Sequence, residues 1–117
     1  MGVVEKKGKL MSLKEITDQT FDSEIFNSEK LAVLDFTATW CQPCKKIKKS
    51  LEELAPVYEG KVVFGEINVE TSPNTALKYG VISLPQVLFF RAGNHLDTIH
   101  GVLAKDKLAA KIDALLG

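Results

Sequence analysis

A nearly unbroken run of apolar side chains at residues 31–37, LAVLDFT, constrains the fold of this chain more than any other segment. A strand that is apolar on both of its faces is typical of the centre of a sheet that helices cover on both sides. The segment VVFGEINV, residues 62–69, predicts a second buried strand. A chain of 117 residues has the length of one domain and buries enough surface to form a core. We therefore expect one α/β domain around a central sheet.

Four helices are predicted around these strands. The longest follows the cysteines, because apolar residues recur there every three or four positions on one stripe, at Cys44, Ile47, Leu51, Leu54 and Tyr58, before Gly60 ends it. The other three have recognisable starts or faces: residues 21–26 with Asp22 or Ser23 as N-cap, a helix from Ser72-Pro73 to Gly80, and Lys105–Leu116 with Leu108, Ile112 and Leu115 facing inward.

The last two strands are predicted to form a hairpin. The segments Gln86–Arg91 and Leu96–His100 flank the turn residues Ala92-Gly93-Asn94. An antiparallel hairpin, added to strands that alternate with helices, makes the central sheet a mixed one.

Charge and cysteine content exclude several classes of protein. The chain has 15 basic and 15 acidic residues and a formal net charge of zero, so it has no long-range field to attract nucleic acid. Two cysteines are too few for a disulfide-dense scaffold, and no apolar stretch has the length of a membrane span. Residues 1–12 do not support a secretory signal. We expect them to be a short flexible extension, or a late start at Met11, before a domain of residues 13–117.

A cluster of lysines follows the cysteines. We interpret it as a solvated helix face rather than as a nucleic-acid site. The i, i+4 spacing predicts two ion pairs on this face, Lys48–Glu52 and Lys49–Glu53.

The two cysteines, Cys41 and Cys44, lie where the first buried strand leads into the long helix. A helix N-terminus carries unpaired N–H groups and the positive end of the dipole, which favour a thiolate. Cys41 lies at that end, whereas Cys44 falls on the buried stripe, so we expect one accessible, nucleophilic sulfur and one shielded sulfur. This asymmetry suits thiol–disulfide exchange, in which Cys41 attacks a disulfide and Cys44 resolves the mixed disulfide.

Two other interpretations of the cysteine pair fit the sequence less well. Free cysteines are often small buried hydrophobic residues, but this spacing and junction are not explained in that way. With His95 and His100 the pair would supply the four ligands of a zinc site. Zinc fingers separate their ligand pairs by about 12–15 residues, whereas 50 intervene here.

Asp35 interrupts the apolar run six residues before Cys41. Burial of a lone carboxylate is costly, so we expect a raised pKa and a proton held near neutral pH. One interpretation makes Asp35 the proton acceptor that helps to deprotonate Cys44. The other makes it a strand-end residue hydrogen-bonded to backbone, and the sequence leaves both open.

Pro85 enters the predicted strand that begins at residue 86, and a proline within a sheet is confined to its start, an edge or a bulge. A cis Leu84–Pro85 bond would open a backbone edge to an extended substrate. Only about 5–6% of X–Pro bonds are cis, so the sequence alone favours trans.

Taken together, these residues resemble the thioredoxin family over residues 13–116. The resemblance rests on motifs in a fixed order: Asp35-Phe36-x-Ala38-x-Trp40-Cys41-x-Pro43-Cys44-Lys45, then Lys78-Tyr79-Gly80-Val81, Pro85, Gly93 and Gly101. It implies the thioredoxin fold, a mixed sheet of four or five strands flanked by four helices. It also implies roles for four residues: Cys41 as attacker, Cys44 as resolver, Asp35 as proton acceptor and a cis Pro85 facing the cysteines.

Several residues depart from the usual family pattern. Gln42 replaces the usual Gly between the cysteines, where related oxidoreductases vary their reduction potential, so we expect a modest shift. Thr37 stands where most members have an aromatic residue, which removes packing beside the site. Glu66 stands where many members have a Lys, and close to Asp35 it would raise the pKa of that residue further.

The expected function is that of a protein-disulfide reductase of the cytoplasm, with a thioredoxin reductase as the electron donor that the resemblance implies. Its redox group would be the Cys41–Cys44 disulfide, without a metal or other cofactor, and we expect a monomer. The alternatives are a disulfide oxidase or isomerase on the same fold, and a non-catalytic binding module.

Substrates are expected to dock on a flat apolar surface that extends to the Val102 region. The residues expected to contact them surround the cysteines: Trp40, Gln42, Pro43, Leu84 and Pro85. Leu84 and Gln86 flank the proline where a smaller aliphatic residue and Thr are commoner in the family, which predicts an altered choice of substrate.

Overall fold

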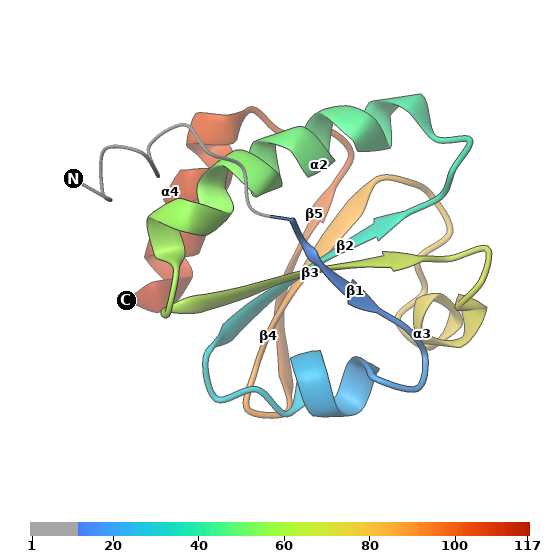
Figure 1. Ribbon diagram of the computed structural model, residues 1–117, viewed down its shortest axis with the longest axis horizontal. Coiled ribbons are helices and arrows are strands. Elements are labelled where there is room, and N and C mark those ends of the chain that lie inside the picture. Colours follow the sequence, from blue (N-terminus) through green and yellow to red (C-terminus); the bar gives the residue numbers. More distant parts are fainter. Residues whose placement is uncertain (1–11) are drawn as a thin grey trace.

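A single five-stranded sheet organises the chain. The computed structural model describes residues 12–117 (Figure 1), so the expected extension at residues 1–12 lies almost wholly outside the described residues. The strand order is β1-β3-β2-β4-β5; β1 and β2 run parallel to β3, whereas β4 is antiparallel to both β2 and β5. The strands are β1 (Lys14–Ile16), β2 (Leu31–Thr37), β3 (Val62–Asn68), β4 (Gln86–Arg91) and β5 (Asn94–His100). The expected mixed sheet is confirmed.

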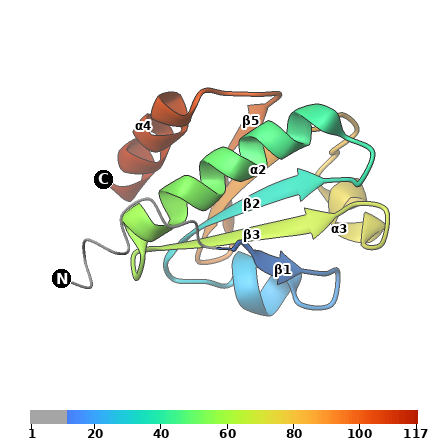
Figure 2. The same ribbon diagram turned by 45° about the horizontal axis from the view of Figure 1, so that its top comes forward.

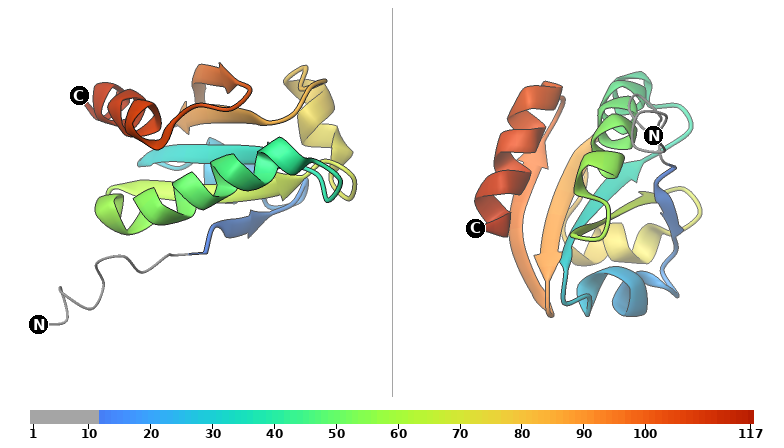
Figure 3. Two further views of the ribbon diagram at one scale, coloured as in Figure 1. Left: turned by 90° about the horizontal axis from the view of Figure 1, so that it is seen from above. Right: turned by 60° about the vertical axis from the view of Figure 1, so that its left-hand side comes forward.

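Helices cover both faces of this sheet. One face carries α2 (Gln42–Leu54) and α4 (Lys105–Leu116), and the other carries the short π-helical segment η1 (Asp22–Phe26) and α3 (Pro73–Lys78) (Figures 2 and 3). None of the helices within residues 12–117 is long and apolar enough to cross a bilayer.

The position of β2 at the centre of the sheet explains why its sequence is almost entirely apolar. Leu31 and Val33 pack in the core beneath α2 and α4, whereas Leu34 and Phe36 pack in the core beneath η1 and α3. Successive side chains of a strand point to opposite faces, so Asp35 shares the face of Leu31 and Val33, beneath α2. The prediction of a central strand covered on both faces is confirmed.

The long helix ends earlier than its apolar stripe predicts. The α-helical part stops at Leu54, and the chain continues as a 3₁₀ turn, η2 (Ala55–Tyr58). Pro56 explains the change, because its ring nitrogen has no hydrogen to donate to a carbonyl one turn earlier. Tyr58 remains buried on the same side as the stripe, and Gly60 follows in a left-handed conformation with φ 84°.

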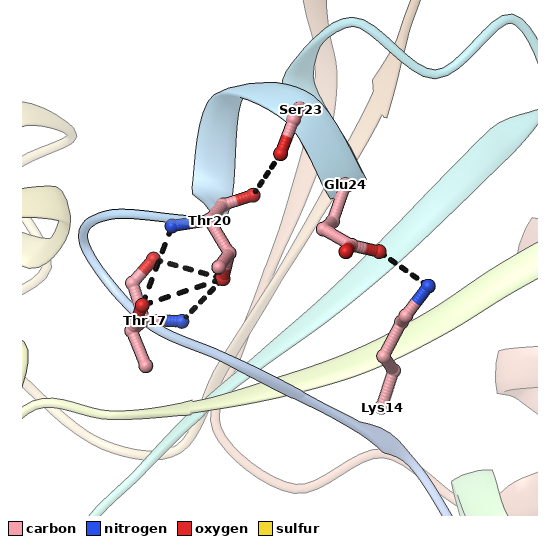
Figure 4. A network of polar contacts seen from close by, with 5 residues as sticks. All are labelled: Lys14, Thr17, Thr20, Ser23 and Glu24. Carbon is pink, nitrogen blue, oxygen red and sulfur yellow. Dashed lines mark hydrogen bonds and ion pairs between the residues drawn. The ribbon is translucent and has the colours of Figure 1, made fainter.

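The start of η1 differs from the prediction. Phe21 is the N-cap residue and is already helical, with φ −54° and ψ −48°, and no side chain caps this end. Asp22 and Ser23 are therefore not N-caps. The preceding turn is built by Thr17 and Thr20: the Thr17 N–H donates to the Thr20 hydroxyl at 2.9 Å, and the Ser23 hydroxyl donates to the Thr20 carbonyl at 3.3 Å (Figure 4).

Strand β1 has no signal in the sequence, because three residues are too few to show a period. Its residues pair in parallel with Gly65–Ile67 of β3. An ion pair between Lys14 and Glu24 links this edge strand to η1 (Figure 4).

Helix α3 starts where predicted but is capped by another part of the chain. Ser72 occupies the N-cap position without a side-chain hydrogen bond. Asp18 accepts from the N–H groups of Asn74 and Thr75 at 3.0 and 2.9 Å, and from the Thr75 hydroxyl at 2.8 Å. A residue more than fifty positions away in sequence thus supplies the cap.

The predicted hairpin is confirmed, with a tighter turn. Ala92 and Gly93 both have positive φ, 49° and 81°, as a two-residue type I′ turn requires. Strand β5 therefore begins at Asn94 rather than at Leu96.

Candidate active site

The two cysteines form a disulfide at the start of α2, with Cα atoms 5.4 Å apart. Cys41 is the N-cap residue and has an extended backbone, with φ −89° and ψ 103°, whereas Cys44 lies in the first helical turn. Pro43 stands between them, within the first two positions of the helix, where its missing N–H costs nothing. The predicted junction of strand, cysteine pair and helix is confirmed.

The exposure of the two cysteines differs from the prediction. Cys41 is 3% exposed and Cys44 is 1% exposed, and they form a small apolar cluster with Ala38, Val69 and Leu84. The prediction that Cys41 is accessible is wrong for the disulfide form, because the bond holds both residues against the same neighbours. The asymmetry that remains is one of position: only Cys41 lies at the helix N-terminus, where backbone N–H groups and the dipole favour a thiolate.

The surface next to the disulfide is apolar with a basic rim. Trp40 is 67% exposed and Val102 is 51% exposed, while Gln42 and Pro43 are also exposed. An open hollow of about 530 Å³ lies against the motif, lined by Gln42, Pro43, Lys45, Lys46 and Val102. Ile82, exposed over 94% of its surface, lies in the loop that leads to Pro85 and had no signal in the sequence.

The Leu84–Pro85 peptide bond is cis, as the resemblance implies and contrary to the expectation from the frequency of cis bonds. The Pro85 carbonyl accepts from the Gly101 N–H at 2.9 Å. Gln86 is only 4% exposed, and its amide donates to the Ser83 carbonyl at 3.0 Å. Gln86 therefore stabilises the loop before β4 and is not exposed to a substrate. Of the two residues that flank Pro85, only Leu84 remains a candidate for influencing substrate choice.

The turn that carries Trp40 is held by a carboxylate that no sequence pattern singles out. Glu70, which follows β3, accepts from the Thr39 N–H at 2.9 Å and from the Thr39 hydroxyl at 2.8 Å. Both bonds lower the pKa of Glu70, and the bond from the Thr39 backbone has the larger effect. Because 31 positions separate Glu70 from Thr39, no local pattern reveals the contact.

Asp35 lies near the middle of the sheet rather than at a strand end. Its side chain is fully buried, and neither carboxylate oxygen has a hydrogen-bond partner among the described residues. The interpretation as a backbone-bonded strand-end residue is therefore wrong. Burial raises the pKa of Asp35 well above its ordinary value, and the negative charge of Glu66 raises it further, while Lys48 acts in the opposite direction. The expected effect of Glu66 is confirmed.

An ion pair links α2 to β3 close to Asp35. The Lys48 Nζ lies 3.1 Å from Glu66 Oε1, and Glu66 is the register partner of Asp35 on the neighbouring strand. The predicted pair Lys48–Glu52 is replaced by this contact. The predicted partner of Lys49, Glu53, pairs instead with Lys105 of α4 at 3.1 Å. Sequence spacing along one helix could not reveal partners on other elements.

A cavity of about 320 Å³ connects this ion pair to the cysteines. Its wall includes Cys44 and Lys48 of α2, Glu66 of β3 and Thr37 at the end of β2. Thr37, which stands where most family members have an aromatic residue, therefore lines the cavity. The lining brings a cysteine and a charged pair to one cavity, which is large enough to hold several water molecules.

The two histidines do not join the cysteines in a metal site. The His95 ring packs edge-on against Tyr79 at 5.5 Å between centroids, and its Nε2 lies 2.8 Å from the Thr98 hydroxyl. Within residues 12–117 there is no group of three or more His, Cys, Asp or Glu side chains placed to hold a metal ion.

Comparison with known proteins agrees with this geometry. The profile of the family described as Thioredoxin matches residues 12–114. The chain belongs to the thioredoxin family. It is 45% identical over 103 residues to thioredoxin 2 of Chlorobaculum tepidum, a match that covers 88% of this chain and 94% of that protein.

Other thioredoxins are similar to a comparable extent. The chain is 43% identical to a thioredoxin of Staphylococcus epidermidis, over 88% of this chain and 97% of that one. It is 40% identical to the chloroplastic M-type thioredoxin of Pisum sativum, over 84% of this chain and 57% of that one. With its disulfide-forming cysteine pair, this member of the thioredoxin family is a thiol–disulfide oxidoreductase that reduces disulfides by dithiol–disulfide exchange.

Proposed function

We propose that Cys41 is the attacking cysteine, Cys44 the resolving cysteine and Asp35 the group that accepts the Cys44 proton. The observation that carries this assignment is the position of Cys41 as the N-cap residue of α2. A thiolate there is stabilised by unpaired backbone N–H groups and by the helix dipole, whereas Cys44 lies inside the first turn.

The exchange then runs in two steps. The Cys41 thiolate attacks one sulfur of the substrate disulfide, so that a mixed disulfide forms and the other substrate sulfur leaves as a thiolate. Cys44 gives its proton to Asp35, and its thiolate attacks Cys41 Sγ. The second substrate thiolate leaves and the Cys41–Cys44 disulfide forms. Two electrons have passed from the cysteine pair to the substrate.

Reduction of insulin disulfides with dithiothreitol as electron donor tests these roles. Cys41→Ser should abolish turnover. Cys44→Ser should retain the first step and accumulate a mixed disulfide that mass spectrometry detects. Asp35→Asn should keep the attack but slow the resolution, by about 10²-fold if Asp35 acts as a general base. A mixed disulfide on Cys41→Ser, with none on Cys44→Ser, would reverse the two assignments.

Partner-protein disulfides are the proposed substrates, held against Trp40, Gln42, Pro43, Leu84 and Pro85. The exposed indole of Trp40 and the exposed Val102 support an apolar docking surface. Alanine at Trp40 should raise the KM for a protein disulfide while leaving the rate with a small aromatic disulfide unchanged. An equal loss with both substrates would argue against docking at Trp40.

A thioredoxin reductase is the proposed electron donor, and the cytoplasm is the proposed location. Membership of the family supports the donor, and a cysteine pair that cycles through the dithiol needs a reducing compartment. Coupled oxidation of NADPH with a thioredoxin reductase tests the donor, and cell fractionation tests the location. An equilibrium potential well above that of reducing thioredoxins would favour a disulfide oxidase instead. Equilibrium sedimentation tests the proposed monomer.

A further inference from the structure

The region between α2 and β3 holds more charge than disulfide exchange at the surface requires. Asp35 is fully buried, and neither of its carboxylate oxygens has a hydrogen-bond partner in the part of the chain that the structure describes; Glu66 lies beside it on the next strand. Lys48 reaches from α2 to Glu66, with 3.1 Å between Nζ and Oε1. Two carboxylates thus lie near one ammonium group; Asp35 is fully buried, whereas the side chains of Lys48 and Glu66 are 42% and 20% exposed. Lys48 and Glu66 line the same cavity as Cys44.

We propose that Lys48 and Glu66 are positioning residues for the resolving step: Glu66 holds the Lys48 ammonium, and together they set the pH range in which Asp35 exchanges a proton with Cys44. This inference rests on the proposed role of Asp35. Neither residue touches the reacting sulfurs, and both act through the charge of Asp35.

The physical argument concerns one cation and two anions. When Asp35 is protonated, Lys48 and Glu66 neutralise each other, and the region carries no net charge. When Asp35 is ionised, one ammonium group lies near two carboxylates, so the buried charge of Asp35 is only partly compensated by a lysine that Glu66 already holds. The pair therefore allows Asp35 to ionise but keeps its affinity for a proton high, as a base that accepts a thiol proton requires.

The two partners act on Asp35 with opposite sign. Lys48 favours the ionised carboxylate, and Glu66 opposes it both by its own charge and by occupying Lys48. Within residues 12–117, Glu66 and Lys48 are the charged groups that act on the pKa of Asp35, and its register partner on β4 is the apolar Val87. The remaining charged groups near the pair are Glu52 on α2, and Glu15 and Lys45 in the cavity wall.

The test uses the reduced full-length protein and an aromatic disulfide whose thiolate product is coloured. Stopped-flow absorbance separates two releases of thiolate, the first from attack by Cys41 and the second from resolution by Cys44. Lys48→Met should slow the second release at pH 7 about tenfold and move its pH midpoint upward. Glu66→Gln should move that midpoint downward and speed the second release below it. The first release should change much less in both variants.

A matched control comes from the other end of α2. Lys105 and Glu53 form an ion pair with the same 3.1 Å separation, outside the cavity lining. Lys105→Met and Glu53→Gln should leave the pH midpoint of the second release unchanged. Lys48→Arg, which keeps the charge, should restore the wild-type midpoint, whereas a packing role for the lysine stem would be satisfied by methionine.

A second readout separates failure of this inference from failure of the role of Asp35. The infrared band of the protonated Asp35 carboxyl group, assigned by its absence in Asp35→Asn, reports the ionisation of Asp35 directly. Opposite shifts of this band in Lys48→Met and Glu66→Gln support the pair, even if Asp35→Asn resolves at the wild-type rate and so removes its role as base. Unmoved bands, or shifts in the same direction, overturn the inference.

Discussion

The two faces of the sheet differ in how they treat polar groups. Beneath η1 and α3, aromatic side chains pack around Phe90, with ring centroids 5.3 Å from Phe21 and 5.3 Å from Tyr79. The carboxylate at that side, Asp18, has three hydrogen-bond donors. Beneath α2, in contrast, Asp35 is buried without a hydrogen-bond partner among residues 12–117, and the neighbouring Lys48 and Glu66 line a cavity.

The contrast indicates a division of labour between stability and chemistry. A buried carboxylate without hydrogen bonds is destabilising when it is ionised, and a domain retains such a group only where the rest of the structure compensates for it. The face beneath η1 and α3 provides well-packed and fully satisfied contacts. The face beneath α2 keeps one unsatisfied acid close to the cysteine pair. Four substitutions, in order of decreasing expected effect, test this division.

Phe90→Ala should cause the largest loss of stability. Phe90 is fully buried at the centre of the aromatic cluster, so its removal leaves a cavity and should lower the free energy of unfolding by about 3–5 kcal/mol. Urea denaturation measures the loss. The resolving step, measured where the variant is still folded, should be unchanged, and Phe90→Leu should lose much less stability. Slowed resolution in the folded variant would show that the two faces are not independent.

Asp35→Asn should raise the free energy of unfolding, whereas Phe90→Ala lowers it. The pKa of Asp35 is raised above 3.8, so the folded protein holds this proton more tightly than the unfolded chain does. Wild type therefore loses stability as the pH rises from 3.8 through the raised value, and asparagine does not. The variant should be more stable by more than about 1 kcal/mol at pH 8 and close to wild type at pH 4.

Thermal unfolding at the two pH values measures this difference, with exposed Asp22→Asn as control. A variant less stable than wild type at pH 8 would contradict the view that the α2 face keeps an unfavourable charge.

Asp18→Ala should remove the cap of α3 and lower the free energy of unfolding by about 1 kcal/mol at neutral pH. Burial acts to raise the pKa of Asp18, but the hydrogen bonds from Thr75 and Asn74 outweigh it, and the pKa is lowered. The stabilisation is therefore complete above the unfolded value of 3.8 and is lost as the pH falls through the folded value. Asp22→Ala, which removes no cap, is the control. If the difference in stability between wild type and Asp18→Ala persists at acidic pH, the effect is one of packing rather than of the charged cap.

Tyr58→Phe should have the smallest effect, a loss of about 0.5 kcal/mol, because the acceptor Asp113 is exposed. The Tyr58 hydroxyl donates to Asp113 Oδ1 of α4 at 2.7 Å. Burial first, and then this bond and the charge of Asp113, raise the pKa of Tyr58 to about 12. The folded protein thus holds the phenol proton more tightly than the unfolded chain, so wild type should lose more stability than the variant as the pH rises from 10 to about 12. Tyr79→Phe is the control, and equal losses in both would indicate that the bond to Asp113 adds nothing.

Periodicity explains which parts of the fold were predictable. The apolar β2, the stripe of α2 and the turn at Gly93 carry their signal within a few adjacent residues, and each element was found. Strand β1 is too short to show a period, and the N-cap of η1 was misplaced because Thr17 and Thr20 build the turn before it. The apolar stripe also continues past Leu54 to Tyr58, so periodicity does not show the change from α-helix to 3₁₀ turn at Pro56.

For the site, the sequence determined the chemistry and the tertiary structure decided its electrostatics. Cys41 and Cys44 follow from a local pattern, because a strand, a helix N-terminus and a three-residue spacing are properties of one short segment. The low exposure of Cys41 depends on neighbours such as Leu84, which lie far away in sequence. Glu66 of β3 is both the ion-pair partner of Lys48 on α2 and the charged neighbour that raises the pKa of Asp35 on β2. Such effects depend on distance in space and on the surrounding dielectric, and no sequence interval encodes either.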